Sequence, residues 1–271
     1  MGKRTLAHLA ILGLLALYML PIAWMLSTAL KPDDELFTEQ IRWVPNRVAW
    51  ENYQHALATF PFWLYLRNTL LIAGLAVVGA LLSCLPPAYA FARLRWRGRN
   101  FWFWVMLSTL MLPPQVTLLP VFLLFRQLGW VDTFLPLIVP AFLGNAFLIF
   151  MLRQFFLTLP QELIDAARLD GCSEWMILWR LVAPMSKPAV ATVALFSFVW
   201  AWTDFMNPLI YLNDSSKFTL AVGLQYFLGR HGEQWNLLMA AATVVTAPLV
   251  LLFLLTQRAY VRGITLTGLK G

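Results

Sequence analysis

The stretch "ELIDAARLDGCSEWMILWRLVAP", residues 162–184, is the part of this chain that decides how the rest is interpreted. It carries six charged side chains and a central glycine, and long apolar runs lie on both sides of it. A segment of this polarity between apolar runs has to face water. We therefore predict a two-part helical loop at residues 158–187, which we call the two-part loop.

The ends of the two helical parts can be predicted from local chemistry. Pro160 suits the first turn of a helix, and the positive end of the helix dipole favours acids such as Glu162 and Asp165. Gly171 is typical of a helix end because glycine readily adopts the left-handed conformation. Ser173 can cap the second helix. The loop is therefore expected to break at the glycine and start again directly after it.

Outward from the loop, the chain is apolar enough for a membrane. It is 60% hydrophobic and only 12% charged, whereas a soluble domain is about 25% charged. Six runs of the length that a membrane helix needs contain no charged residue except Asp204; they cover residues 5–30, 68–92, 100–125, 133–152, 188–212 and 234–257. We predict an all-α integral membrane protein with six transmembrane helices in a single domain over residues 1–271.

The first span is expected at about residues 6–30 and the core spans at about 68–257. A secretory signal peptide is the alternative for the first run, but the run is longer than the usual apolar region and "STALK" is a poor cleavage site. We therefore predict an uncleaved span.

The distribution of basic residues predicts the orientation. Thirteen Lys and Arg residues fall on the side that carries the two-part loop and both chain ends, and seven fall on the other side. Because basic residues collect on the cytoplasmic side, both termini and the loop are expected there. The predicted pI of about 9.7 is then explained by the basic residues on the cytoplasmic side of the membrane. Membrane lipids are expected to surround the chain, and no nucleic-acid partner is expected.

The first helix of the loop has a narrow apolar stripe made of Leu163, Ala166 and Ala167. A helix of about ten residues is marginal alone in water, so this face would suit a groove on another protein. The alternative is an amphipathic connector on the lipid surface. That alternative fits poorly, because such helices favour basic residues and large apolar ones.

These residues resemble the EAA loop of permease subunits in binding-protein-dependent ABC importers. The family pattern is roughly E-L-x-E-A-A-x-x-D-G-A, followed by an aromatic residue and a later L-P. This chain matches it with Glu162, Leu163, Asp165, Ala166, Ala167, Asp170, Gly171, Trp179 and Pro184. It departs from the pattern at Asp165 for Glu, Cys172 for Ala and Ala183 for Leu.

The resemblance covers nearly the whole chain. The segments "WVPNRVAWENYQHAL", "TLMLPPQVTLLPVF", "WTDFMNPLIYL" and "RGITLTGLKG" are similar to the carbohydrate-uptake branch, and in particular to the second, smaller permease of maltose-type systems. Thr203 stands where that branch usually has Asn. The resemblance implies the transmembrane domain of a type I ABC importer, multi-pass in a bacterial or archaeal cytoplasmic (inner) membrane.

The resemblance also implies partners. The two-part loop would be a coupling helix that docks on a cytoplasmic ATPase dimer, beside a second permease subunit and an extracytoplasmic solute-binding protein. The implied ATPase contact consists of Glu162, Leu163, Asp165, Ala166, Ala167, Asp170 and Gly171. The chain lacks the phosphate-binding G-x-x-x-x-G-K-[ST] loop. It is therefore expected to be no enzyme, with no cofactor or metal of its own and with ATP bound by the partner.

Asp204 is the one carboxylate inside a predicted span, and such residues are functional candidates by default. We expect a polar lining of the transport pathway from Trp202, Thr203, Asp204 and Asn207, with Pro208 breaking the helix. The alternative is a structural carboxylate at the membrane interface.

The expected function is to form half of the pathway for a sugar or related solute. A permease for glycerol phosphate or another non-sugar solute remains an alternative. An ion-coupled secondary transporter and a scaffolding subunit are further alternatives, but the first would need ionisable residues at the midplane.

Overall fold

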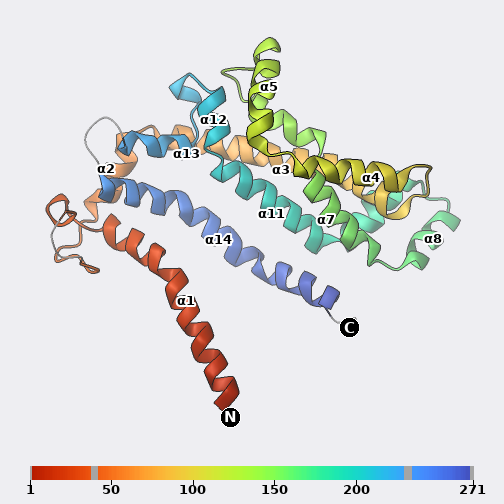
Figure 1. Ribbon diagram of the computed structural model, residues 1–271, viewed down its shortest axis with the longest axis horizontal. Helices are drawn as coiled ribbons and strands as arrows, with labels where there is room; N and C mark the ends of the chain where they lie inside the picture. Colours follow the sequence, from red (N-terminus) through yellow and green to blue (C-terminus); the bar gives the residue numbers. More distant parts are fainter. Residues whose placement is uncertain (1, 38–41, 229–233, 269–271) are drawn as a thin grey trace. The chain divides into compact units, whose positions relative to one another are not determined.

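The computed structural model describes residues 2–37, 42–228 and 234–268, and it describes side chains at residues 5–37, 42–228 and 234–257. These parts of the chain are helical and contain no strand. The chain divides into two compact units (Figure 1). The first unit is Met1–Trp63 with Leu220–Leu251, and the second is Leu64–Thr219 with Leu252–Gly271.

The first unit contains both long and short helices. They are α1 (Gly2–Ala29), η1 (Asp33–Glu35), α2 (Glu51–Thr59), α13 (Leu220–Gly223), η6 (Leu224–Phe227) and the first half of α14 (Trp235–Gly268). Two buried asparagines hold this unit together at the end of α1. The Nδ2 groups of Asn52 and Asn236 both donate to the carbonyl of Lys31, at 2.8 and 3.2 Å.

The second unit carries the two-part loop and most of the predicted spans. Its elements are α3 (Phe62–Arg93, from Leu64 on), α4 (Arg99–Ser108), η2 (Thr109–Met111), α5 (Pro114–Gln127), α6 (Leu135–Ile138), η3 (Val139–Leu143), α7 (Ala146–Leu157), α8 (Gln161–Leu169), α9 (Glu174–Ile177), the π-helical η4 (Leu178–Val182), α10 (Ala183–Met185), α11 (Lys187–Thr203), α12 (Met206–Tyr211) and η5 (Ser215–Lys217).

Four described helical segments are long and apolar enough to cross a membrane: Thr5–Ala29, Phe62–Arg93, Leu135–Leu157 and Trp235–Gln257. Two bent pairs bring the number to six if each pair is one span. They are Arg99–Met111 with Pro114–Gln127, bent by 96°, and Glu174–Met185 with Lys187–Thr203, bent by 86°. The all-helical membrane fold is thus confirmed, but two of the six predicted spans are not straight helices.

The 96° bend lies at two prolines, and a separate change of backbone direction lies at a glycine before α7. Pro113 and Pro114 both lack the N–H group that a helical hydrogen bond needs, and Pro113 is extended, at φ −63° and ψ 134°. The 3-10 helix η2 accordingly ends at Met111, before the prolines, and α5 begins at Pro114. Gly144, at φ 89°, separates η3 from α7, and the side chain of Asn145 then caps α7 by accepting from the N–H of Leu148.

The predicted run at residues 188–212 is also corrected. The helix ends at Thr203 because Asp204 is extended, at φ −67° and ψ 115°, and a short α12 follows. Pro208 was expected to break the helix, but it lies in the first turn of α12. Proline is tolerated in a first turn because the N–H groups there have no helical partner.

The core of the second unit lies between α3, α7, α11 and the two-part loop. Its buried residues include Cys84, Leu85 and Ala88 of α3, Leu148, Leu152 and Phe156 of α7, Ile164, Ile177, Leu178 and Val182 of the loop, and Ala189 and Val193 of α11. Figure 1 shows α7 and α11 running side by side, and residues of the two helices contact one another. The loop is therefore built on a packed base rather than suspended from two spans.

Helix α3 packs closely through small residues. Ala73, Ala76 and Ala80 recur at helical spacing and are buried, and the Ser83 hydroxyl donates to the carbonyl of Ala141 at 2.8 Å. At Gly79 an added Cβ would lie 2.6 Å from the Phe142 ring. Small residues of this kind let membrane helices approach one another.

We predict that Gly79→Ala lowers the free energy of unfolding by about 1–3 kcal/mol, because the Phe142 ring and the adjacent backbone would have to move. Gly74→Ala in the same helix is the matched control, since its Cβ would meet nothing within 4 Å. Thermal unfolding of the purified protein in detergent would compare them. Equal melting temperatures for the two variants would contradict the close packing at Gly79.

Candidate functional site

The two-part loop starts with a regular helix that ends as its sequence predicts. Pro160 precedes α8 in an extended conformation, and Gly171 follows it at φ 79°. The N–H of Gly171 donates to Arg168 O and the N–H of Cys172 donates to Ala167 O, both at 3.0 Å. This pair of bonds is a Schellman motif, which satisfies the last carbonyls of a helix.

The second part of the loop is capped and then widens into a π-helical turn. The Ser173 side chain accepts from the N–H of Met176, as predicted, and starts α9. The chain continues through the π-helical turn η4 and the short α10. At Ser186 it turns into α11, and this turn is the 86° bend described above.

One face of the loop is buried against α3 and α7. Ile164 and Ile177 are each 1% exposed, and Ala167 and Trp179 pack against the same core. The two halves are thus fixed by an apolar anchor on either side of the Gly171 turn. Because Gly171 itself has no atom within 4 Å of its would-be Cβ, the turn points into open space.

The opposite face exposes large apolar side chains. Leu163 is 43% exposed, Leu169 90% and Trp175 63%. Of the predicted ATPase-contact residues, Glu162, Leu163, Asp165, Ala166, Asp170 and Gly171 are exposed and Ala167 is half-buried. Leu169 and Trp175 were not among the predicted residues, although Leu169 follows Ala166 by three residues on the same face.

A network of charged side chains joins the two halves across the Gly171 turn. The Arg168 guanidinium donates to Asp165 Oδ1 at 2.9 Å and to Glu174 Oε1 at 2.7 Å. The second carboxylate oxygen of Glu174 accepts from the Tyr89 hydroxyl of α3 at 2.5 Å. Glu174 therefore bonds both to the first half of the loop and to a transmembrane helix.

The network closes through the last turn of α3. Arg93 lies four residues after Tyr89, and its guanidinium donates to Gln161 Oε1 at 2.7 Å. Gln161 in turn donates from Nε2 to Asp165 Oδ1 at 3.0 Å. We call this set the polar ring; its members are Tyr89, Arg93, Gln161, Asp165, Arg168 and Glu174.

Arg93 also completes the end of α7. Its Nε donates to the carbonyl of Phe156 at 3.0 Å, and its Nη2 bonds to the carbonyls of Phe156 and Leu159. Carbonyls in the last turn of a helix have no helical partner, so this arginine provides them with one. It joins α3, the end of α7 and the start of α8.

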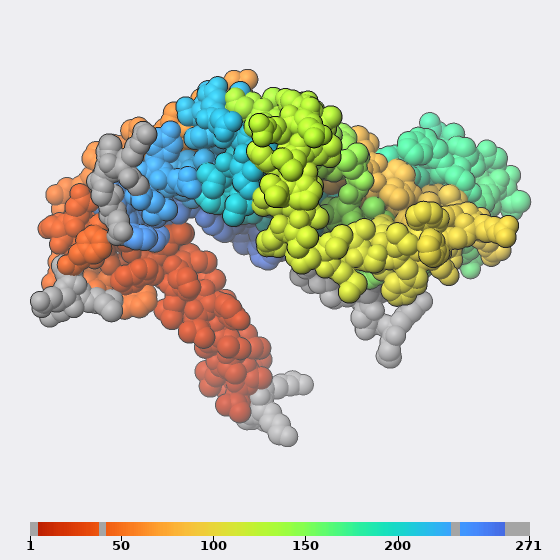
Figure 2. Space-filling model, turned by 45° about the horizontal axis from the view of Figure 1, so that its top comes forward, coloured from red at the N-terminus to blue at the C-terminus, as the bar shows by residue number. Residues whose placement is uncertain are grey.

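A cleft of about 990 Å³ lies beside the polar ring. Besides ring members, its lining includes Arg95, Trp96 and Arg99 from the segment after α3. Figure 2 shows the green-to-teal loop at the surface next to the yellow segment that begins α4. Four arginines against two carboxylates make this cleft predominantly basic.

The polar ring was not found from the sequence. The Asp165–Arg168 pair has the three-residue spacing of a helical ion pair, and that spacing alone could have indicated it. Tyr89 and Glu174, however, are 85 residues apart, and no local pattern brings them together.

The four predicted pathway residues do not form one cluster. Trp202 is 2% exposed and stacks on Phe198 at 5.3 Å, while the Thr203 hydroxyl donates to the carbonyl of Val199. Asp204 and Asn207 contact each other through their side chains. The carboxylate of Asp204 accepts from the backbone N–H of Asn207 at 3.1 Å and from its Nδ2 at 2.8 Å. The carboxylate thereby holds the start of α12.

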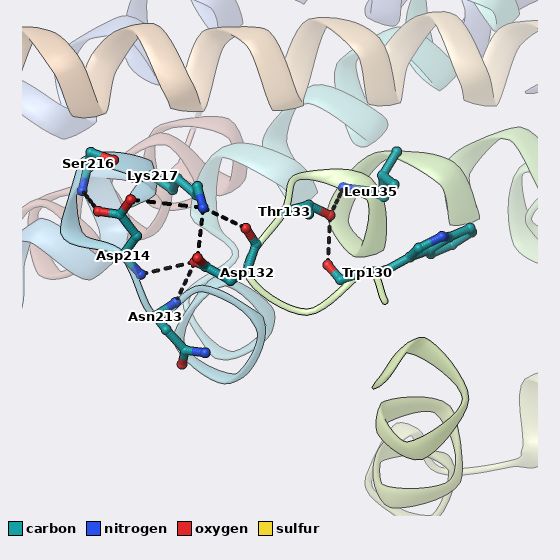
Figure 3. A network of polar contacts seen from close by, with 8 residues as sticks. All are labelled: Trp130, Asp132, Thr133, Leu135, Asn213, Asp214, Ser216 and Lys217. Atoms are coloured by element: carbon teal, nitrogen blue, oxygen red, sulfur yellow. Dashed lines mark hydrogen bonds and ion pairs between the residues drawn. The ribbon is translucent and has the colours of Figure 1, made fainter. Parts of the chain in front are cut away.

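A second polar network surrounds Asp132, which is the only described non-glycine residue at positive φ, 61° (Figure 3). Its Oδ1 accepts from the N–H groups of Asn213 and Asp214, both at 3.0 Å. Lys217 Nζ lies 2.7 Å from its Oδ2 and donates to its carbonyl at the same distance. These bonds tie the segment between α5 and α6 to the segment between α12 and η5.

The bonds at this network lower carboxyl pKa values. The N–H of Asp214, the Lys217 ammonium and the N–H of Asn213 lower the pKa of Asp132 to about 2. The N–H of Ser216 likewise lowers the pKa of Asp214. Among the described side chains, no group of three or more His, Cys, Asp or Glu residues is placed to hold a metal ion.

Helices that are long and apolar enough to cross a membrane, together with an exposed polar loop, define the class of integral membrane proteins. The chain belongs to the family of binding-protein-dependent transport system inner membrane components, which it matches over residues 85–266. This confirms the resemblance drawn from the loop and the predicted function as a permease subunit.

Several relatives cover nearly the whole chain. An arabinooligosaccharides transport system permease protein AraQ of Halalkalibacterium halodurans is 32% identical over 254 residues, 93% of this chain and 91% of the relative. An sn-glycerol-3-phosphate transport system permease protein UgpE of Yersinia pestis is 32% identical over 97% of this chain and 96% of its own. Probable ABC transporter permease protein YurM of Bacillus subtilis is 32% identical over 93% and 83%.

A solved structure shows the same fold. It is the crystal structure of a bacterial ABC transporter involved in the import of the acidic polysaccharide alginate. The TM-score is 0.83 at 24% identity, with 94% of this chain and 96% of that chain covered. The predicted fold of a type I importer transmembrane domain is therefore confirmed.

We predict that Asp132→Asn lowers the melting temperature by a few degrees at pH 6, and that this difference shrinks as the pH falls. A folded pKa of about 2 lies below the ordinary value of about 3.9. The stabilisation is therefore complete above about pH 3.9 and is lost as the pH falls through 2. Asn also adopts positive φ, so the variant removes the charge without straining the backbone. A difference that stays constant from pH 6 to pH 2 would contradict this role.

Proposed function

We propose that this chain forms half of the translocation pathway of an ATP-driven importer for a sugar or related solute. A second permease would form the other half, and a separate ATPase dimer would bind the two-part loop. An extracytoplasmic binding protein, the kind of partner that the family's name implies, would deliver the solute. The chain would lie in the cytoplasmic membrane with both termini and the loop inside.

One observation carries the proposal: a charged, water-facing loop displays large apolar side chains on a rigid base. Exposed apolar surface framed by polar residues is typical of protein interaction sites. Leu163 and Leu169 on α8 and Trp175 on α9 form such a surface. We propose the ATPase contact at Glu162, Leu163, Ala166, Asp170 and Gly171, extended by Leu169 and Trp175. Asp165 and Ala167 would support this contact indirectly. Asp165 belongs to the polar ring, and Ala167 packs against the core.

This arrangement suggests how ATP would drive transport. Closure of the ATPase dimer would move the docked loop, and the loop is packed against α3, α7 and α11. Packed elements move as rigid bodies between discrete arrangements. ATP would thus shift the permease between two states, with no nucleotide bound by this chain.

The solute is inferred from the relatives and from the charge of the candidate pathway. AraQ and UgpE match equally well, so a glycerol phosphate is the second candidate. Among Trp202, Thr203, Asp204 and Asn207 there is no basic residue, and the carboxylate would repel a phosphate. A neutral sugar, whose hydroxyl groups can donate to Asp204 and Asn207, is therefore favoured. Family membership likewise favours a binding-protein-dependent importer over an ion-coupled secondary transporter.

We predict that Gly171→Asp reduces co-purification of the ATPase with the tagged complex by at least about tenfold, because an unpaired charge buried in an interface costs about 2 kcal/mol or more. Asp tolerates positive φ better than most residues, and the site has open space around it. The variant should therefore reach the membrane in normal amounts. A pull-down in mild detergent, quantified by mass spectrometry, would measure the loss.

Gly171→Asn is the matched control, since it has the same size and the same tolerance of positive φ without the charge. It should retain more ATPase than Gly171→Asp. Wild-type ATPase recovery for both variants would contradict the proposed contact. Absence of any ATPase from the wild-type complex would contradict the proposed function.

We also predict that Asp204→Asn lowers the maximal rate of sugar uptake about tenfold. This factor corresponds to the loss of one hydrogen bond from the sugar to a charged carboxylate, which is worth ~1.5 kcal/mol. Asn keeps an acceptor for the N–H of Asn207, so the start of α12 and the melting temperature should be preserved. Uptake into proteoliposomes at saturating binding protein would measure the rate. Wild-type uptake by Asp204→Asn, with a melting temperature lowered only in Asp204→Ala, would show that the carboxylate is a cap alone.

A further inference from the structure

The polar ring joins the two helical parts of the loop across the turn at Gly171. At Gly171 the chain turns through positive φ, and no neighbouring atom lies within 4 Å of the position a side chain would take. Arg168 lies before this turn and Glu174 lies after it. Their 2.7 Å ion pair therefore sets the angle between the two helical parts.

Glu174 bonds both to the other half of the loop and to a predicted span through side chains alone. One oxygen accepts from Arg168 and the other from the Tyr89 hydroxyl. Each of the two carboxylate oxygens therefore has a protein donor. A movement of α8 would thus be carried through Arg168 and Glu174 to α3.

The ring contributes little stability by comparison with the apolar core. The side chains of Arg168, Asp165 and Glu174 are 32%, 54% and 42% exposed, and exposed ion pairs are worth about 0–1 kcal/mol. Ile164 and Ile177, by contrast, are fully buried. Removing the ring should therefore leave the loop folded and alter its orientation and rigidity.

We propose that Glu174, held by Arg168 and Tyr89, is a positioning residue that locks the two-part loop onto α3 and so couples ATP hydrolysis to transport. This inference rests on the proposed function. The ring transmits movement from the ATPase to the span, and the exposed face of the loop binds the ATPase. Binding and transmission are thus assigned to different residues of one loop.

The test uses the whole transporter, with partner permease, ATPase and binding protein, reconstituted in proteoliposomes. The measured quantity is the solute transported per ATP hydrolysed, for wild type, Glu174→Gln and Tyr89→Phe. We expect normal ATPase recovery and continued hydrolysis, with the ratio lowered by about fivefold or more, the lower end of typical coupling between two sites.

Two matched controls make the same chemical changes outside the loop. Glu51→Gln breaks the exposed Arg47–Glu51 pair of α2, 2.6 Å long, and Tyr53→Phe removes a hydroxyl from the same helix. Both should keep the wild-type ratio. The double variant Tyr89→Phe/Glu174→Gln should lower the ratio no further than Glu174→Gln alone, because the two groups share one bond.

Three outcomes would overturn the inference. Transport and hydrolysis that fall in proportion, with an unchanged ratio, would reduce the ring to a structural feature. Loss of the ATPase from Glu174→Gln would place Glu174 in the docking surface instead. Additive effects of Tyr89→Phe and Glu174→Gln would contradict the shared bond. Failure of the wild-type complex to hydrolyse ATP or transport solute would contradict the proposed function itself.

Discussion

The constraint on which this structure depends is that a bilayer interior offers no hydrogen-bond partner to the backbone. Continuous helices meet it, and α3 does so even with Pro86 and Pro87 inside it. Where the helices stop, side chains replace the missing partners. Asn145 caps α7 at its start, Arg93 binds the carbonyls at its end, and Asp204 receives the N–H of Asn207. These three polar side chains of the second unit thus lie at helix ends.

That distribution explains how far the sequence could predict the fold and the site. Features set by neighbouring residues were predicted: the helix that ends at Gly171, the cap at Ser173 and the apolar runs. Features set by distant residues were not, and the bond between Tyr89 and Glu174 is the clearest case. The breaks within two of the predicted spans were not located from the sequence for a related reason. Apolarity indicates that a segment lies in the membrane, but it does not separate Pro86 and Pro87, which lie inside one helix, from Pro113 and Pro114, where a new helix begins.

The two-part loop combines requirements that normally conflict. To transmit a movement it has to be rigid, and to receive a partner it has to expose surface. The chain separates these by face, since Ile164 and Ile177 are buried while Leu169 and Trp175 are exposed. The charged residues lie between the two faces. Among them, Asp165, Arg168 and Glu174 pair with one another and with Tyr89 of α3, which explains their mixed signs.

Comparison of the left-handed turns at Asp132 and Gly171 shows why one is aspartate and the other glycine. At Asp132 the side chain of the turning residue itself binds Asn213, Asp214 and Lys217, so the turn is fixed from within. At Gly171 there is no side chain, and the turn is fixed from outside by Arg168 and Glu174. Asp132 can bear the modest cost of positive φ because its carboxylate gains three partners. Gly171 leaves the surface at the turn clear, as a surface that receives another protein requires, and the polar ring supplies the rigidity that glycine cannot.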